Sequence, residues 1–183
     1  LFDKNVIVDI SRVGSVETKS LIMGILIMKL QEYRMQPDKM NESLQHITVL
    51  EEAHNLLRRT SFAQAQESSN LQGKSVEMLT NAIAEMRTYG EGFMIADQAP
   101  DMLDEAVIRN TNTKIIFRLP DEHDCELVGK SIALSNVQIK ELAKLPAFVA
   151  VIHQNDWIEA VLCKSAKYDK ERKYAFSKKE SNS

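Results

Sequence analysis

Hydrophobic residues along the chain gather in short runs, which are separated by longer stretches of mixed character. Four runs rich in β-branched residues stop at polar or proline positions and predict buried strands, at 5–11, 46–50, 92–98 and 113–119. Two later runs, at 149–152 and 157–163, flank Asn155-Asp156 and predict a hairpin.

The stretches between these runs carry apolar residues at helical spacing. The first predicted helix begins after the N-cap candidate Ser15 and ends near Arg34. Its apolar residues nearly encircle it, which predicts packing on most sides. Gly90 is the expected C-cap of the second helix, and Ser135 with Gln138 forms a capping box before the last one. These further helices are expected at 75–89, 100–109, 124–134 and 136–145.

The order of strands and helices predicts an α/β fold with a mostly parallel sheet, helices on both faces and a C-terminal β-hairpin. We expect one domain over 1–163, with a mobile surface loop at 60–73 where Gln, Ser and Ala dominate. The segment 164–183 is a basic tail with seven basic and three acidic residues. Such a tail can contact nucleic acid, and the alternative is a solvated, frayed end.

Composition adds a cellular setting. The 183 residues are 44% hydrophobic and 27% charged, with net charge -3, which is the balance of a soluble globular protein. Cys125 and Cys163 lie far apart, which favours a reducing cytoplasmic compartment over a disulfide framework or a zinc site. The longest apolar run, 21–28, is too short for a transmembrane segment. Because the chain begins at Leu1, inside a strand pattern, we expect it to be a piece of a longer protein.

Polar residues stand at the ends of three predicted strands, at Asp9, Glu51-Glu52 and Asp97-Gln98. Ligands of open parallel sheets bind at this edge. The run 47–54, an apolar strand that delivers two adjacent acids, resembles a Walker B motif. Glu51 would hold Mg²⁺ through a water, and Glu52 would orient and deprotonate the water that attacks the γ-phosphate. The alternative is a solvated pair of glutamates at a helix start.

Five segments in this order, between Asn5 and about Ile152, resemble the HerA/FtsK family of P-loop ATPases. They resemble the strand before Walker B, Walker B itself, an arginine-bearing helix end, a sensor strand with a Gln-x-Pro ending, and the final core strand. The segments are Val8-Asp9-Ile10-Ser11, Leu50-Glu51-Glu52-Ala53-His54-Asn55, Ala84-Glu85-Met86-Arg87-Thr88-Tyr89-Gly90, Ile95-Ala96-Asp97-Gln98-Ala99-Pro100 and Asn110-Thr111-Asn112-Thr113-Lys114-Ile115-Ile116-Phe117-Arg118-Leu119.

This resemblance implies the C-terminal half of a RecA-like core in an ATP-driven DNA translocase. It implies a homo-oligomer, a hexameric ring with DNA in its channel and ATP with Mg²⁺ between subunits. A nuclease or a secretion channel would be a possible further partner. The same resemblance leaves conjugation, genome segregation and end resection equally open.

The resemblance also implies site roles. Gln98 would hydrogen-bond the γ-phosphate or the attacking water, and the alternative is a backbone contact before Pro100. Arg87 would act as an arginine finger on a neighbouring subunit, or it would only complement a helix C-terminus. Arg118 is the second candidate for the finger and for phosphate binding. It shares a strand face with Lys114, and the two would otherwise form the polar side of an edge strand.

His54 directly follows the acid pair, and the four histidines have no metal-ligand spacing with each other or with the cysteines. A capping or packing role for His54 stands beside a role in coupling nucleotide to DNA. The sequence Glu51-Glu52-Ala53-His54 also suggests a DEAH-box helicase. Such helicases carry Ser-Ala-Thr after the next strand, whereas this chain has Asp97-Gln98.

Two departures from the family pattern matter. The first acid is Glu51 where aspartate is commoner, and no Gly-x-x-x-x-Gly-Lys-Ser/Thr loop occurs in the 183 residues. Gly73-Lys74-Ser75 and Gly129-Lys130-Ser131 both lack the earlier glycine. We therefore expect the Walker A loop upstream and the piece alone to be inactive. The alternative is a non-catalytic, ATPase-like interaction module.

Without the P-loop strand, the strands 92–98 and 113–119 lose a common neighbour in the family's sheet. Unpaired strand edges favour association. We expect either a strand rearrangement or pairing with a second copy.

Overall fold

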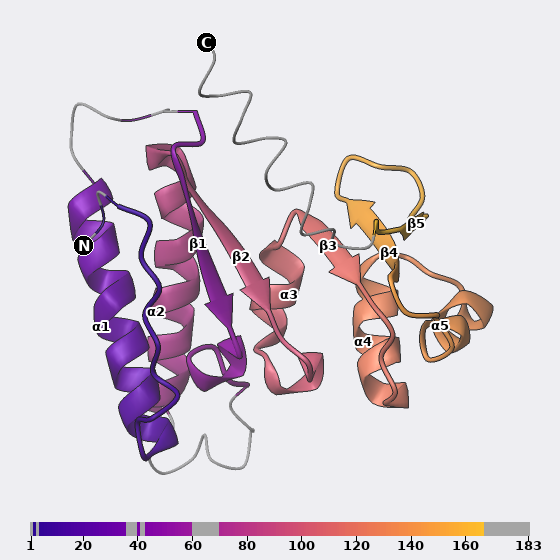
Figure 1. Cartoon of the computed structure of the whole chain (residues 1–183), viewed down its shortest axis with the longest axis horizontal. Coiled ribbons are helices and arrows are strands. Elements are labelled where there is room, and N and C mark those ends of the chain that lie inside the picture. Colours follow the sequence, from indigo (N-terminus) through magenta and orange to yellow (C-terminus); the bar gives the residue numbers. More distant parts are fainter. Residues whose placement is uncertain (1, 3, 36–39, 41–42, 60–69, 167–183) are drawn as a thin grey trace. The chain divides into compact units, whose positions relative to one another are not determined.

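The computed structural model describes residues 2, 4–35, 40, 43–59 and 70–166; a thin grey trace marks the remaining residues in Figure 1. The chain forms two compact units, Leu1–Asn112 and Thr113–Ser183. The predicted α/β class is confirmed. No helix in the described part of the chain is both long and apolar enough to span a bilayer.

The first unit is built around a parallel strand pair (Figure 1). β1 and β2 pair in parallel from His46 opposite Glu91 to Glu51 opposite Ala96. The elements in chain order are α1 (Val16–Arg34), β1 (His46–Glu51), η1 (Ala53–Asn55), α2 (Asn70–Met86), η3 (Arg87–Tyr89), β2 (Glu91–Ala96), η4 (Pro100–Met102) and α3 (Glu105–Asn110).

Helix α1 begins as predicted, because the Ser15 hydroxyl accepts a hydrogen bond from the Thr18 N–H at 3.1 Å. It packs against α2 and η1 through one stripe of residues, which are Met23, Ile27 and Leu30. The opposite residues Leu21, Ile25 and Met28 are at least half exposed. The expectation that α1 packs on most sides is therefore wrong, since nothing described covers that second stripe.

The strand pair has one covered and one open face. Residues at alternate positions of a strand share a face, and Leu50 on the helix side is buried. On the other side Ile47, Val49 and Met94 are each about half exposed. Within the described residues, helices therefore cover one face of this pair rather than both.

Helix α2 tightens into η3 and ends at Gly90, whose φ of 77° confirms the predicted cap. Of the predicted loop 60–73, residues 60–69 lie outside the described part. Residues 70–73 belong to α2, so the loop prediction is wrong there. Gln and Lys are good helix formers, and one glycine within a helix costs only about 1 kcal/mol.

The predicted strand 5–11 is not a strand. Its apolar residues Val6, Ile7 and Val8 are solvent-exposed, with Ile7 at 96%, and only Ile10 is partly buried. At its end the Asp9 carboxylate accepts the Ser11 N–H at 2.8 Å. A strand needs a neighbour for its N–H and C=O groups, and no described strand pairs with these residues.

The second unit is an antiparallel sheet with two helices. The predicted hairpin is confirmed, although its second strand begins at Val161 rather than Trp157. The predicted parallel strand 113–119 is shorter and runs antiparallel to β4, so that prediction is wrong in direction. Hydrophobic periodicity is the same for both directions. The elements are β3 (Thr113–Ile116), α4 (Glu122–Ser131), α5 (Asn136–Leu142), β4 (Val149–Gln154) and β5 (Val161–Lys164).

A separate core holds this unit together. Asp121 caps α4 by accepting the His123 and Asp124 N–H groups, and the predicted Ser135–Gln138 capping box is present on α5. The core side chains come from β3, from α4 and its C-cap residue, from α5 and from the segment after α5; they are Ile116, Cys125, Val128, Ile132, Ile139, Leu142 and Leu145. The predicted domain 1–163 remains a prediction, and the tail residues 167–183 lie outside the described part.

Candidate functional site

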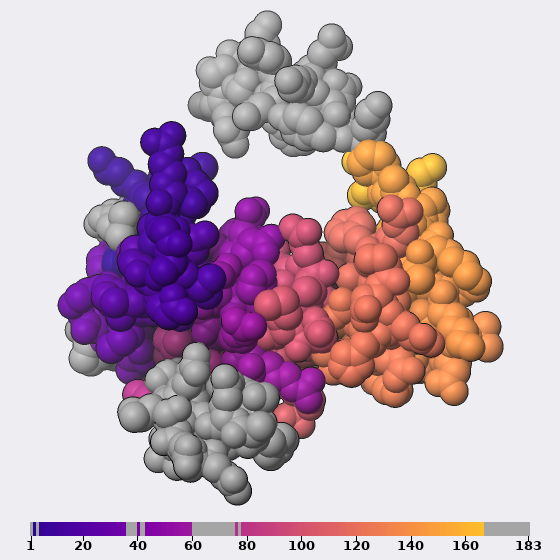
Figure 2. All heavy atoms as spheres, turned by 90° about the horizontal axis from the view of Figure 1, so that it is seen from below, coloured from indigo at the N-terminus to yellow at the C-terminus, as the bar shows by residue number. Residues whose placement is uncertain are grey.

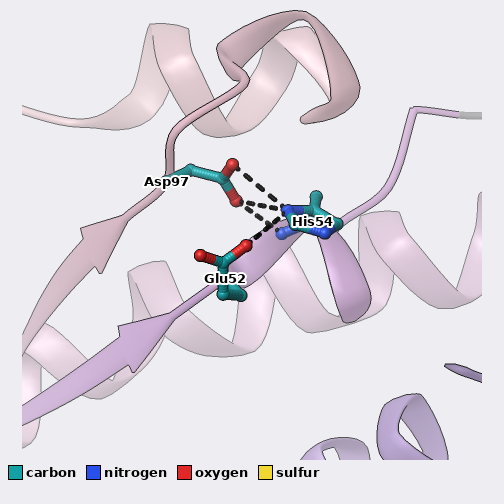
Figure 3. A group of neighbouring side chains, drawn as sticks. All are labelled: Glu52, His54 and Asp97. Carbon is teal, nitrogen blue, oxygen red and sulfur yellow. Dashed lines mark hydrogen bonds and ion pairs between the residues drawn. The ribbon is translucent and has the colours of Figure 1, made fainter.

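The candidate site lies where β1 and β2 end. Both arrows point to the lower end of Figure 1, the side from which Figure 2 is viewed. Because parallel strands finish at the same edge, the residues after Glu51 and after Ala96 come together. Figure 3 shows three of their side chains converging, Glu52, His54 and Asp97.

Glu52 has an unusual backbone. Its φ of 51° and ψ of 48° are left-handed, which is uncommon for a residue with a side chain and occurs often at functional sites. The backbone N–H and side-chain amide of Asn55 both donate to the Glu52 carbonyl, at 3.0 and 2.9 Å. The Glu52 side chain is half exposed, and its Oε1 accepts a 2.8 Å hydrogen bond from the Gln98 amide.

Asp97 is the buried carboxylate of the site, with a side chain only 3% exposed. It accepts the backbone N–H of His54 at 2.8 Å and that of Ala99 at 3.0 Å. Its oxygens also lie 3.0 and 3.2 Å from His54 Nδ1. One side chain therefore ties the segment after β1 to the segment after β2.

His54 stands between the two carboxylates. Its Nδ1 lies 3.0 Å from Asp97 Oδ2 and 3.6 Å from Glu52 Oε2. Ionised carboxylates only accept hydrogen bonds, so this nitrogen carries a hydrogen in the arrangement described. The interaction was not predicted, because the histidine and the aspartate are 43 positions apart. The available signal was that both follow parallel strands that end in acids.

The structure brings two of the predicted catalytic residues, Glu52 and Gln98, into direct contact. Glu51 is the last residue of β1 and is exposed. Its carboxylate has no hydrogen bond or ion pair within the described part of the chain. An exposed carboxylate at this edge suits Mg²⁺, which prefers oxygen ligands and keeps several of its waters.

A second donor set consists of Glu52, His54 and Asp97, which offer one ligand atom each within 4.8 Å of one another. These atoms already contact each other in part. A metal bound through His54 Nδ1 would have to displace the hydrogen that this nitrogen shares with Asp97.

Of the two predicted arginines, only Arg87 belongs to the same unit as this cluster. Arg87 is exposed and opens η3, just before β2, so it stands at the opposite end of that strand from the site. Arg118 belongs to the second unit, follows β3 and is exposed. Lys114 does not form a polar strand side with it, because Lys114 is buried and burial lowers the pKa of its amine.

A further buried network, which was not predicted, occupies the opposite end of the strand pair. The Glu91 carboxylate, with no exposed side-chain surface, accepts the Arg34 Nε–H at 2.8 Å and the Thr48 hydroxyl at 2.6 Å. His46 Nδ1 is 2.8 Å from the same carboxylate. The network joins the end of α1 to both strands.

No protein-family model and no curated protein matches the sequence. Solved structures share the fold at 14% sequence identity. The DNA-packaging ATPase B204 of Sulfolobus turreted icosahedral virus aligns with a TM-score of 0.57 over 85% of this chain and 66% of that one. The genome packaging NTPase B204 of Sulfolobus turreted icosahedral virus 2, in complex with AMPPCP, aligns with a TM-score of 0.56 over 79% of this chain and 63% of that one.

VirB4 of Thermoanaerobacter pseudethanolicus aligns with a TM-score of 0.64 over 89% of this chain, again at 14% identity. The chain spans only 41% of VirB4 and 63% of the B204 complexed with AMPPCP. These likenesses establish the fold that the chain shares with the three proteins.

Proposed function

We propose that this chain is part of an ATP-hydrolysing DNA translocase motor of the HerA/FtsK class. The observation that supports this most is the contact between Glu52 and Gln98 at the carboxyl edge of a parallel strand pair. An acid and an amide side by side at this edge suit the activation of a water beside a phosphate. The fold shared with DNA-packaging NTPases is consistent with the proposal.

In this proposal Glu52 is the general base. Its half-exposed carboxylate accepts the proton of the attacking water, while the Gln98 amide orients that carboxylate and reaches the water or the γ-phosphate. Glu51, exposed beside it, holds Mg²⁺ through a water. Bound Mg²⁺ with ATP would neutralise charge on the phosphates.

The remaining parts come from outside the described cluster. No phosphate-binding Gly-x-x-x-x-Gly-Lys-Ser/Thr motif occurs in these 183 residues, so the proposed motor needs such a loop in addition to this cluster. Arg87 acts as the arginine finger on a neighbouring subunit, with Arg118 as the second candidate. The working assembly is a homo-oligomeric ring around DNA, with a nuclease or a secretion channel as a further partner.

The test is ATP hydrolysis by the natural full-length protein, with and without DNA, for the wild type and Glu52→Gln. We expect the variant to bind ATP and to lose about 10²–10⁴ in kcat, because general-base catalysis contributes that much. Glu32→Gln is the matched control, since this exposed residue of α1 pairs with Lys29, away from the site. It should keep wild-type activity.

An inactive wild type with DNA present would favour the alternative, a non-catalytic ATPase-like interaction module. A Glu52→Gln variant with wild-type kcat would keep the motor and remove this residue from its chemistry.

A further inference from the structure

The Glu52 carboxylate is approached from both sides. Gln98 donates to Oε1 at 2.8 Å, and His54 Nδ1 stands 3.6 Å from Oε2. The first contact is a hydrogen bond and the second is an electrostatic approach just beyond hydrogen-bond distance. The amide of Gln98 therefore holds one carboxylate oxygen, and the ring nitrogen of His54 stands near the other.

The His54 ring is itself held in place. Its own backbone N–H and its Nδ1 both reach Asp97 Oδ2, at 2.8 and 3.0 Å. Asp97 is buried, and it is fixed in turn by the Ala99 N–H at 3.0 Å. The backbone N–H contact fixes the start of η1, and the ring itself is held through Nδ1, whose hydrogen is directed at Asp97 before any ligand arrives.

We propose that His54 is a positioning residue for the Glu52 carboxylate, with Asp97 fixing its ring and its Nδ1–H tautomer. This rests on the proposed function, in which Glu52 is the base. Asp97 and His54 then orient the Glu52 carboxylate before the reaction begins. Hydrogen-bonded residues behind a catalytic group orient that group in many enzymes in the same way.

A merely structural role makes a different prediction. If His54 only started η1, its backbone N–H on Asp97 would suffice and any side chain would serve. The positioning role instead requires a donor at the place of Nδ1. An asparagine side chain can bring its amide nitrogen close to that place, whereas a glutamine amide reaches the place of Nε2.

The experiment compares His54→Asn, His54→Gln and His54→Ala in the full-length protein. We expect kcat within about threefold of wild type for asparagine, and a loss of roughly 10² for glutamine and alanine, with the KM for ATP unchanged. Equal kcat for all three variants would overturn the proposal. Circular dichroism checks that each variant is folded.

A second readout does not need ATP hydrolysis. The carbon and nitrogen chemical shifts of His54 in the 183-residue chain report which ring nitrogen carries the hydrogen. We expect the Nδ1–H form in wild type and its loss in Asp97→Ala. A bare Nδ1 in wild type would overturn the proposal whatever the activity, whereas an inactive protein with Nδ1–H would refute only the proposed function.

Discussion

At the scale of single residues, the buried charge of Glu91 has the largest expected effect on stability. Its side chain is inaccessible, and Arg34, His46 and Thr48 surround it at hydrogen-bond distance. Removing one member of a buried charged pair leaves the others without compensation, which costs about 3–5 kcal/mol.

We predict that Glu91→Gln lowers the free energy of unfolding by about 3 kcal/mol. The carboxylate accepts hydrogen bonds through both oxygens, whereas the glutamine NH2 group would face a donor of the network and leave both without an acceptor. Urea unfolding of the chain followed by circular dichroism measures this. Glu32→Gln, in an exposed pair with Lys29, should change it by less than about 1 kcal/mol. Equal effects of both substitutions would contradict the prediction.

Residue-level features were predictable where they are local. The Ser15 cap, the Gly90 cap and the Ser135 capping box each depend on neighbours within three or four positions, and all three are present. The Glu91 and Asp97 contacts join residues 43 to 57 positions apart. Such contacts depend on which strands become neighbours, and local spacing does not contain that information.

At the scale of elements, α4 and α5 approach closely at Gly129. A methyl group built there would lie 2.6 Å from Ile139 Cγ1, and Ile139 belongs to the core of its unit. Glycine is thus required by space rather than by backbone conformation, and this contact sets how near the two helices come.

We predict that Gly129→Ala destabilises the second unit by about 1–2 kcal/mol. Overpacking costs about 1–3 kcal/mol, and better helix propensity returns up to about 1 kcal/mol. Urea unfolding followed by the fluorescence of Trp157, in the same unit, measures the change. Lys130→Ala, at the exposed neighbouring position, is the control and should have little effect; a Gly129→Ala variant as stable as wild type would contradict the prediction.

Most elements could be predicted from the sequence, but not all of their partners. Helical and strand periodicities located α1, α2, β1, β2 and the C-terminal hairpin. Periodicity does not report strand direction, so β3 was predicted to be parallel, whereas it runs antiparallel to β4. It also does not report whether a strand has a neighbour, so the apolar run 5–11 was wrongly predicted as a strand.

At the scale of the whole molecule, strand edges and an apolar sheet face are left uncovered by the residues that the structure describes. Among the described strands β2 pairs only with β1, and β3 only with β4. The open face of the first pair carries Ile47, Val49 and Met94. Exposed edges and apolar patches promote association, so pairing with a second copy stays a prediction for the isolated chain.

Light scattering tests the predicted association of the isolated chain with a second copy. We expect the 183-residue chain to have a mass above that of a monomer, and Val49→Lys to lower the mass by placing a charge on the open face. Val137→Lys is the control, because Val137 is a similarly exposed apolar residue on α5. A monomeric wild type, or equal masses for both variants, would contradict the prediction.

Two buried carboxylates hold β2 to β1, one at each end. Glu91 opens β2 and contacts His46 and Thr48, while Asp97 follows β2 and contacts His54. A slip of the strands by one residue would turn Glu91 to the opposite face and away from its donors. The two carboxylates therefore fix the register of β1 and β2. A displacement of the C-terminal end of α1, which contacts Glu91 through Arg34, would move both strands and the Glu52 edge together instead of sliding one strand along the other.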